Sequence, residues 1–333
     1  MRRLESFDPL QLTKYGLQQL RESVAGHLTE HENIQSDAAN VLIVPSLIVS
    51  ADLIHNALTG SRANFLCEKA AFVKMVTNIH SFRKTMFGLP MDENGIKLDA
   101  LAQQLAMHPY AVLHIDPADQ VPTGIASGDE RLRLIMELVK KYRIPVIEVG
   151  HLRDVWNEKP YPPSLKSRQG GENVIYTGSF IRSYPLDMRV SWVVAEQRVI
   201  EHLTDADIQM DLRVGLFQQL VADEIFRRGE YHEVMAAIRD FVRKRRILSL
   251  QMCEHYLHDC ATWEPRHCLF HFWIRLKGMN TRVLFERKRF DTFAPGYFFD
   301  GADSEHVLLC PPSLEKSTLE KAIKQIRAFA GTG

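Results

Sequence analysis

Between residues 40 and 200, short β-rich runs alternate with helical patterns, and this alternation constrains the fold more than any other feature of the sequence. The apolar runs lie at residues 41–44, 64–67, 110–115, 145–149, 173–177 and 190–195. Amphipathic segments lie between several of these runs, and the strongest covers residues 129–141. Strands that alternate with helices are typical of a mainly parallel sheet with right-handed crossovers. The sequence therefore predicts an α/β fold with three layers, α/β/α.

The pattern changes after residue 200. A long helical region covers residues 199–256 and contains the basic run Arg243-Lys-Arg-Arg246, which we interpret as a solvated helix face because acidic residues flank it. From residue 270, short strands lead to a final helix at 313–329, which indicates a smaller C-terminal α+β lobe. We expect a large domain over 1–200, connecting helices over 201–256 and a small domain over 257–333.

The charge balance excludes one class of function. Lys plus Arg and Asp plus Glu each number 41, so the formal net charge is zero. A chain that holds nucleic acid by a bulk positive field needs a clustered basic excess, so we expect no direct nucleic-acid binding by this chain alone. No apolar run approaches the roughly 18 residues of a membrane helix, so we expect no membrane association.

The cysteines indicate a reducing compartment. Their number is five, and no Cys-x-x-Cys pair occurs among them, which fits the cytoplasm better than a disulfide framework. Cysteines and histidines gather between residues 253 and 271, but their spacings match no zinc template. The sequence therefore predicts no metal site.

Three motifs follow one another along the first 200 residues. They are Asp119-Gln-Val-Pro-Thr-Gly124, Val146-Ile-Glu-Val-Gly-His151 and Gly178-Ser-Phe-Ile-Arg182. Their order and spacing resemble the fold-type I aminotransferases that use pyridoxal phosphate (PLP). The resemblance is greatest to the aminotransferase-like effector domain of MocR-type regulators, a branch of the GntR family. It extends from Tyr15-Gly-Leu to the last helix, and it implies the PLP-dependent transferase fold over 1–200 with an N-terminal arm truncated.

The positions that carry the chemistry of that family are altered here. The lysine that forms a Schiff base with PLP falls on Arg182, whose delocalised guanidinium stays protonated and cannot form the imine. The acid that holds the pyridine nitrogen protonated falls on Val149, and the tyrosine two residues later falls on His151. Leu47 replaces the glycine of the phosphate turn, and the arginine that binds the substrate carboxylate falls at about Leu308.

Other residues of the resemblance are retained. Ser179 and Arg189 keep the types that contact phosphate, Gln120 matches a polar residue of the Pro-Thr-Gly motif, and Phe72 stands where an aromatic ring stacks on PLP. We favour the interpretation that these are packing and turn residues. The alternative is a degenerate cofactor pocket that also includes His151, in which Arg182, Arg189 and Ser179 hold a small anion. Such a pocket could take PLP, pyridoxamine phosphate (PMP) or phosphate weakly, without a covalent bond.

Other catalytic signatures are missing from the sequence. It contains no Gly-x-Ser-x-Gly elbow, no Walker loop and no paired-carboxylate signature. The acidic residues Asp52, Glu68 and Glu148 are interpreted as surface or capping groups.

The first hypothesis is a catalytically inactive pseudoenzyme, a ligand-sensing and dimerising effector domain in the cytoplasm. It is related to the MocR-type transcription regulators but lacks their winged-helix DNA-binding domain, and the resemblance implies a homodimer. One alternative is an aminotransferase with an atypical site, which would use Lys159 or Lys166. Another is a non-catalytic partner subunit of an active paralogue.

Overall fold

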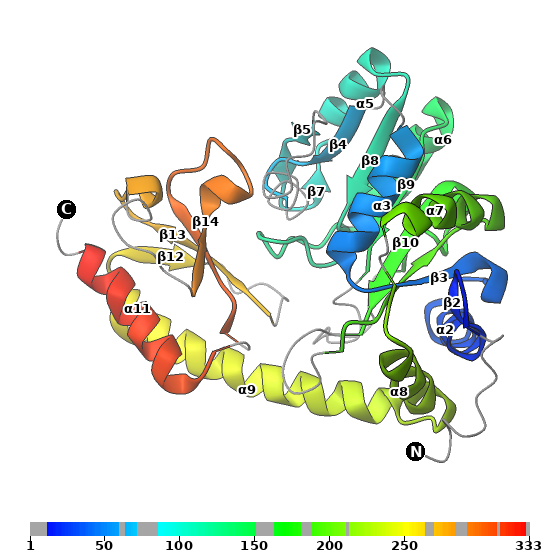
Figure 1. Ribbon diagram of the computed structural model, residues 1–333. Coiled ribbons are helices and arrows are strands. Elements are labelled where there is room, and N and C mark those ends of the chain that lie inside the picture. Colours follow the sequence, from blue (N-terminus) through cyan, green and yellow to red (C-terminus); the bar gives the residue numbers. More distant parts are fainter. Residues whose placement is uncertain are drawn as a thin grey trace.

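The computed structural model describes residues 12–59, 64–71, 86–150, 163–180, 188–210, 213–263, 270–283, 292–311 and 314–330. Its centre is a seven-stranded sheet with the strand order β3-β11-β10-β9-β8-β4-β5 (Figure 1). The strands are β3 (Val41–Val44), β4 (Asn64–Glu68), β5 (Met86–Leu89), β8 (Ala111–Ile115), β9 (Val146–Val149), β10 (Val174–Ser179) and β11 (Ser191–Val194). All the strand runs predicted between residues 40 and 200 therefore belong to one sheet.

The sheet is mainly parallel, as predicted, with one exception. Strands β5, β4, β8, β9 and β10 pair in parallel, whereas β11 is antiparallel to both β10 and β3. The chain between β10 and β11 covers only residues 180–190, which is shorter than a parallel crossover connection needs. The short connection therefore fixes the direction of β11.

Helices cover both faces of this sheet and complete the three layers. Helices α3 (Leu47–Thr59) and α7 (Gln197–Met210) pack together, and buried α3 and α7 residues share a core with Phe65, Val112 and Ile147. Helices α5 (Leu98–Met107) and α6 (Asp129–Tyr142) pack on the opposite face, against Leu113 and Val146. Neighbouring strand residues such as Val146 and Ile147 enter different cores because side chains alternate across a sheet.

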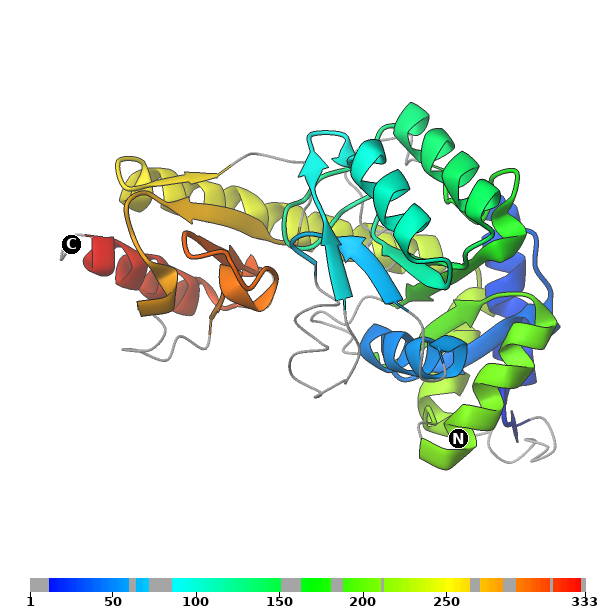
Figure 2. The ribbon, with the colours of Figure 1, turned by 90° about the horizontal axis from the view of Figure 1, so that it is seen from above.

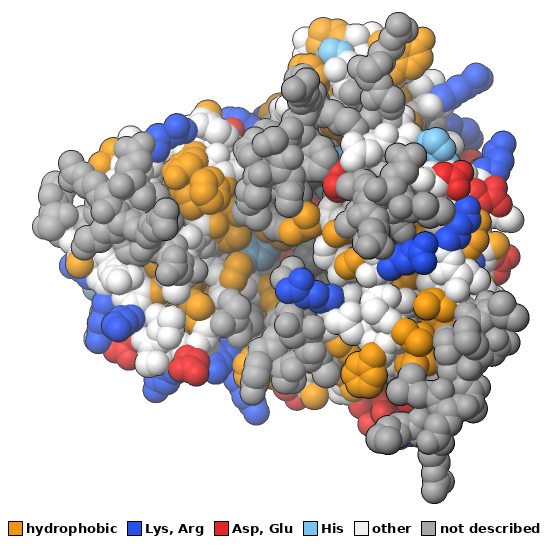
Figure 3. All heavy atoms as spheres, in the orientation of Figure 1, with side chains coloured by type: hydrophobic (Ala, Val, Ile, Leu, Met, Phe, Trp, Pro, Cys, Tyr) orange, Lys and Arg blue, Asp and Glu red, His pale blue; other side chains and the backbone are white. Residues whose placement is uncertain are grey.

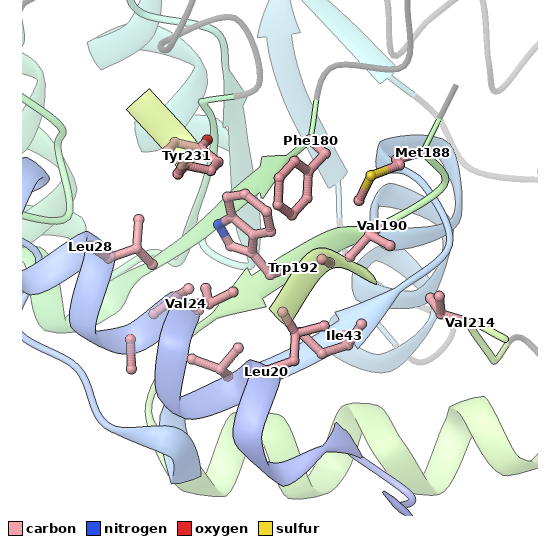
Figure 4. Close-up of a cluster of buried hydrophobic side chains, with 14 of the residues drawn as sticks. Leu20, Val24, Leu28, Ile43, Phe180, Met188, Val190, Trp192, Val214 and Tyr231 are labelled. Atoms are coloured by element: carbon pink, nitrogen blue, oxygen red, sulfur yellow. The ribbon is translucent and has the colours of Figure 1, made fainter. Parts of the chain in front are cut away.

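Helix α2 (Gln18–Glu32) covers the β3 and β11 end of the sheet. Its residues Leu20, Val24 and Leu28 recur at helical spacing and are fully buried. Figure 4 shows them on the face of the helix that is turned toward Trp192. Gly178 on β10 makes room for this core, because a Cβ there would lie 2.3 Å from Trp192 Nε1. The glycine of the Gly-Ser-Phe-Ile-Arg motif therefore has a packing role.

The predicted helical region 199–256 consists of more than one helix. Helix α7 is followed by α8 (Leu216–Arg227) and the long α9 (Tyr231–Leu257). Gly215 precedes α8, and Gly229 has a φ of 70° between α8 and α9. The helices are therefore separated at these glycines, although apolar residues recur at helical spacing on both sides of them.

A second sheet lies at the far end of α9. It has the antiparallel order β12-β13-β15-β14, with β12 (Ala261–Trp263), β13 (Phe272–Leu276), β14 (Phe293–Pro295) and β15 (His306–Leu309). Helix α11 (Lys316–Ala330) packs on α9 beside it. Figure 2 shows this sheet and α11 at one end of α9 and the seven-stranded sheet at the other. The predicted limits of the domains stay a prediction.

The described residues also form two short hairpins: β1 (Leu12–Thr13) with β2 (Gly16–Leu17), and β6 (Met91–Asp92) with β7 (Gly95–Ile96).

The basic run on α9 is only partly solvated. Arg243 and Lys244 are exposed as predicted, but Arg246 is buried, and its guanidinium lies 4.7 Å from the centre of the Phe272 ring. On the face shown in Figure 3, basic and acidic side chains are interspersed, which agrees with the balanced charge. None of the helices in the described ranges is long and apolar enough to span a membrane.

Candidate functional site

A pocket lies where the C-terminal ends of parallel strands approach the first turn of α3. It is narrow: about 530 Å³ of space lies between its atoms, open solvent included, but only about 30 Å³ of this space can hold the centre of a water molecule. The lining residues come from the ends of β4, β8, β9 and β10, from α3 and from the turn after β8: Leu47, Ile48, Ser50, Ala51, Glu68, Ala71, His114, Asp116, Gln120, Val121, Ile147, Val149 and Thr177. In open α/β sheets, ligands bind at this edge of the sheet.

The start of α3 forms one wall of the pocket. Pro45 follows strand β3, and the Ser46 hydroxyl accepts a hydrogen bond from the Val49 N–H at 3.2 Å, so Ser46 caps the helix as its sequence position suggests. The next two residues, Leu47 and Ile48, place branched apolar side chains in the lining. The wall therefore lacks the small residues that let a phosphate approach backbone N–H groups at a helix N-terminus.

Two carboxyl groups face the pocket from neighbouring strands. Glu68 ends β4 and is 2% exposed, and its Oε1 accepts a hydrogen bond from the Asp116 N–H at 2.8 Å. Burial raises the pKa of Glu68 to about 7, because an ionised carboxylate is poorly solvated there. Burial, together with the nearby carboxyls of Asp119 and Glu68, raises the pKa of Asp116 well above its ordinary value. The pocket can therefore hold protonated carboxyl groups near neutral pH.

A buried imidazole lies in the same lining. His114 is 7% exposed on β8, and burial lowers its pKa to about 4, so the ring is neutral at pH 7. Its Nδ1 has no hydrogen-bond partner among the described residues. An unsatisfied buried nitrogen costs free energy, and such a group in a pocket can serve a ligand.

The structure brings only part of the predicted site into this pocket. Gln120 lines it, but its side chain is committed to the turn: Nε2 donates to Ala70 O and Val121 O, and Oε1 accepts from the Thr123 hydroxyl. Ser179 is buried at the end of β10 and does not line the pocket, and Arg189 is exposed. Phe72, His151 and Arg182 lie outside the described residues.

Two of the five positions at which the sequence departs from the family pattern lie in the pocket. Val149 ends β9 and lines the pocket, and so does Leu47. Leu308 does not: it is buried on β15 and pairs with Trp273 and Ala294. Among the lining residues that the structure describes, none is a lysine or an arginine.

The candidate lysine Lys166 lies at another place. Its ammonium donates hydrogen bonds to Val174 O at 2.7 Å and Gly171 O at 3.3 Å. Burial lowers its pKa, although nearby acidic groups such as Glu148 act in the opposite direction. It lines a second, more open hollow with Asn33 and Glu196. Lys159 lies outside the described residues.

Two of the acidic residues that were interpreted as surface or capping groups do not lie at the surface. Glu68 and Glu148 are each only 2% exposed. Glu148 does act as a cap, because its carboxylate accepts hydrogen bonds from the Ser164 hydroxyl and from the N–H groups of Leu165 and Lys166. Glu68 instead lines the pocket. Its position at the end of one apolar strand run, followed along the chain by another such run, is the feature of the sequence that could have predicted this.

The sequence is similar to those of known transcriptional regulators. No family model matches the sequence. The chain is 30% identical to the HTH-type transcriptional regulator YisV of Bacillus subtilis over 312 residues, which cover 93% of this chain and 64% of YisV. It is 22% identical to the HTH-type transcriptional regulator NorG of Staphylococcus aureus (strain USA300), covering 95% of this chain and 71% of NorG. The chain therefore spans somewhat less than two thirds of the length of YisV.

Several solved aminotransferases have a similar structure. A kynurenine aminotransferase of Pyrococcus horikoshii superposes with a TM-score of 0.86 at 21% identity, covering 99% of this chain and 85% of that one. The chain is similar in sequence to HTH-type transcriptional regulators over most of its length and has the fold of aminotransferases. The predicted fold class and the resemblance are thus confirmed.

PLP is the cofactor of the enzymes that share this fold, so we compared the chemical groups of PLP with the residues of the pocket. PLP brings a phosphate dianion and a pyridine nitrogen that an acid keeps protonated. The described lining offers the carboxyls of Glu68 and Asp116 without a basic partner, and it offers Val149 where the family has its acid. Leu47 and Ile48 fill the phosphate turn. The described residues of the pocket therefore do not fit PLP.

Proposed function

We propose that this chain is a catalytically inactive, aminotransferase-like effector domain of a MocR-type regulator and that its pocket binds a small ligand without covalent chemistry. The observation that carries the proposal is the lining of the pocket. It retains the position of a cofactor site at the strand ends, but it combines Leu47 and Val149 with two carboxyls, the buried Glu68 and the half-buried Asp116. A pocket with this lining can select a ligand, but it lacks the groups that activate PLP.

The lack of a suitable amine supports the absence of catalysis. Arg182 stands at the position of the Schiff-base lysine, and its guanidinium cannot form an imine. Lys166 is held by two backbone carbonyls away from the pocket lining. Without an amine among the described residues that line the pocket, an aldehyde cofactor has no partner in this lining.

The charges of the lining favour an amine as the ligand. Glu68 and Asp116 have raised pKa values because no described cation compensates their burial. An amine that enters the pocket can take a proton from one of them and form an ion pair, which removes the cost of the buried acid. The apolar side chains of Leu47, Ile48 and Val149 would contact the aliphatic part of that ligand.

Treatment with PLP tests the absence of catalysis. Purified protein is incubated with PLP, its visible absorbance is recorded, and any imine is fixed with borohydride and located by mass spectrometry. We expect no adduct at a single lysine of the chain. A stoichiometric adduct on one lysine would overturn the inactive assignment, and its loss in Lys166→Met or Lys159→Met would favour the atypical enzyme.

Thermal unfolding with a panel of small molecules tests the ligand class. The probes are butylamine, inorganic phosphate and PMP, applied to wild type and to Glu68→Gln. We expect butylamine to raise the Tm of wild type more than that of Glu68→Gln, because the ion pair needs the carboxylate. Stabilisation by inorganic phosphate without any by butylamine would contradict the amine and would support an anion site at Ser179, Arg182 and Arg189, whereas PMP, which carries both an amine and a phosphate, shows whether one molecule can engage both.

We infer that reading of DNA belongs to a separate helix-turn-helix module and that this chain acts as its sensor in the cytoplasm, as a homodimer. The relatives YisV and NorG are named as HTH-type regulators, and the balanced charge of this chain supports that division of labour. A gel shift at low salt and a sedimentation measurement test these two points. Salt-sensitive, sequence-specific DNA binding by this chain or a monomer at micromolar concentration would contradict them.

A further inference from the structure

Three histidines meet where the end of α2 approaches the start of α9. His27, His31 and His232 each offer one ring nitrogen, and these nitrogens all lie within 4.8 Å of one another. We propose that these three histidines bind a divalent transition-metal ion of the zinc type. Among the residues that the structure describes, this is the one group of three possible ligands that comes so close together.

The backbone brings the three side chains to one place. His27 and His31 are four residues apart on α2, so they lie on the same face of the helix, one turn apart. His232 lies in the first turn of α9, directly after Tyr231. The His-x-x-x-His spacing is visible in the sequence, but the third ligand comes from a helix that lies far along the chain.

Imidazole is a ligand that suits Zn²⁺, Ni²⁺ and Cu²⁺, and three imidazoles with an open fourth position form a common zinc site. Tetrahedral zinc with nitrogen ligands places those nitrogens about 3.3 Å apart, so the ligand atoms must approach one another by up to about 1.5 Å. The side chains of His31 and His232 are exposed to solvent. The opening to solvent also provides the entry path for the ion.

The buried member of the group is held in position by its neighbours. The ring of His27 packs edge-on against Tyr231, with centroids 4.4 Å apart, and lies 5.3 Å from the ring of Phe226. The rings of His31 and His232 are nearly perpendicular at 4.3 Å. One fixed ligand and two adjustable ligands can therefore close around an ion without disturbing the core.

The carboxylate of Glu32 lies near the ring of the buried His27. Glu32 is buried, with Oε1 4.0 Å from His27 Nε2, and its Oε2 accepts a hydrogen bond from the Tyr176 hydroxyl at 3.0 Å. Carboxylates that contact a metal-bound imidazole orient the ring and increase its basicity. At 4.0 Å the contact is an ion-pair distance and not a hydrogen bond, so the role that we assign to Glu32 in the proposed site is to place a negative charge beside His27.

A metal at this site would join two parts of the molecule. Helix α2 packs on the seven-stranded sheet, and α9 extends from that sheet to the four-stranded sheet (Figure 1). An ion held by His31 and His232 would fix the first turn of α9 to α2. The occupied site would stabilise the folded chain, since an ion that binds only the folded state stabilises it by mass action.

Calorimetry and cobalt spectroscopy test the proposal on the full chain, with any histidine tag removed. We expect one Zn²⁺ per chain, a rise of Tm with Zn²⁺, and visible d–d bands of a tetrahedral complex with Co²⁺. The variant His31→Ala/His232→Ala removes two exposed ligands and should weaken Zn²⁺ binding at least about 100-fold. Glu32→Gln should retain the stoichiometry but weaken the affinity about 10-fold.

The control is His255→Ala/His258→Ala, which removes two exposed histidines from the other end of α9. It should bind Zn²⁺ as wild type does. Equal loss of binding in this control, or unchanged binding in His31→Ala/His232→Ala, would overturn the proposal, and so would the absence of any metal-dependent change in Tm. Circular dichroism verifies that each variant is folded before metal is added.

Discussion

Glu68 Oε1 accepts a hydrogen bond from the backbone N–H of Asp116 at 2.8 Å, and this contact joins the ends of the neighbouring strands β4 and β8 at the pocket. One hydrogen bond from a backbone N–H lowers the pKa of a carboxyl, but burial outweighs it, so the pKa of Glu68 rises to about 7. The acid is therefore retained at a cost to stability, which is typical of a residue that serves a site.

Glu68→Gln tests that cost. The ordinary pKa of this glutamate is 4.5 and its pKa in the folded chain is about 7. Between these values the folded state binds more protons than the unfolded state, so stability falls as pH rises, by about 3 kcal/mol in total. Gln can still accept the Asp116 N–H and does not ionise. We expect Glu68→Gln to be more stable than wild type at pH 8 and nearly equal to it at pH 4.5, measured by urea unfolding.

The control for this experiment is Glu130→Gln. Glu130 is exposed, and its hydrogen bond with Arg133 lowers its pKa, so loss of its charge should not raise stability at pH 8. If the free energies of unfolding of Glu68→Gln and wild type changed in parallel between pH 4.5 and 7, the pKa of Glu68 would not be raised in the folded chain.

His114→Leu tests the second titratable group of the pocket. Burial lowers the pKa of His114 from 6.5 to about 4, so between these values the unfolded state binds more protons. Because of His114, the free energy of unfolding of wild type therefore falls by about 3 kcal/mol as pH decreases from 6.5 to 4. This slope opposes that of Glu68 over most of the same range. We expect the leucine variant to lose stability more steeply than wild type as pH rises from 4.5 to 6.5; an unchanged slope would contradict the buried neutral ring.

The fold could be predicted largely because the strands between residues 40 and 200 are short and apolar and alternate with helices. The direction of β11 could not, since it depends on the length of the connection after Phe180 and not on the strand's own residues. The helical region 199–256 was predicted without limits for its individual helices, because glycine within an amphipathic pattern weakens a helix without always ending it. Only the structure shows that Gly215 and Gly229 lie between helices.

The site could be predicted only in part. Leu47 and Val149 were recognised from their positions in motifs, and both line the pocket. Glu68 was interpreted as a surface group because a carboxylate is ordinarily exposed, and its burial arises from the convergence of strand ends that are distant in sequence. The same limit applies to His232, whose approach to His27 and His31 depends on the packing of α9 against α2.

Arg182→Lys tests whether a single substitution separates this chain from a PLP enzyme. The new lysine supplies an amine at the motif position, but Val149 and Leu47 stay in the pocket. We expect no stable imine absorbance with PLP in this variant. The triple variant Arg182→Lys/Val149→Asp/Leu47→Gly should bind PLP more tightly, by at least about 10-fold, because it also restores the acid and the phosphate turn. Stable imine formation by Arg182→Lys alone would contradict the role assigned to the other two residues.

Gly178→Ala tests the packing role of the glycine in the Gly-Ser-Phe-Ile-Arg motif. An added Cβ would lie 2.3 Å from Trp192 Nε1, and Trp192 is 1% exposed, so the indole or the strand must move. Overpacking of this kind costs about 1–3 kcal/mol. The matched control is Gly26→Ala on α2, where nothing lies within 4 Å of the new Cβ and helix propensity favours alanine by about 0.5–1 kcal/mol. Urea unfolding should therefore move in opposite directions for the two variants. Equal stability of Gly178→Ala and wild type would mean that the Trp192 core accommodates the methyl group, and the glycine of the motif would then need an explanation other than packing.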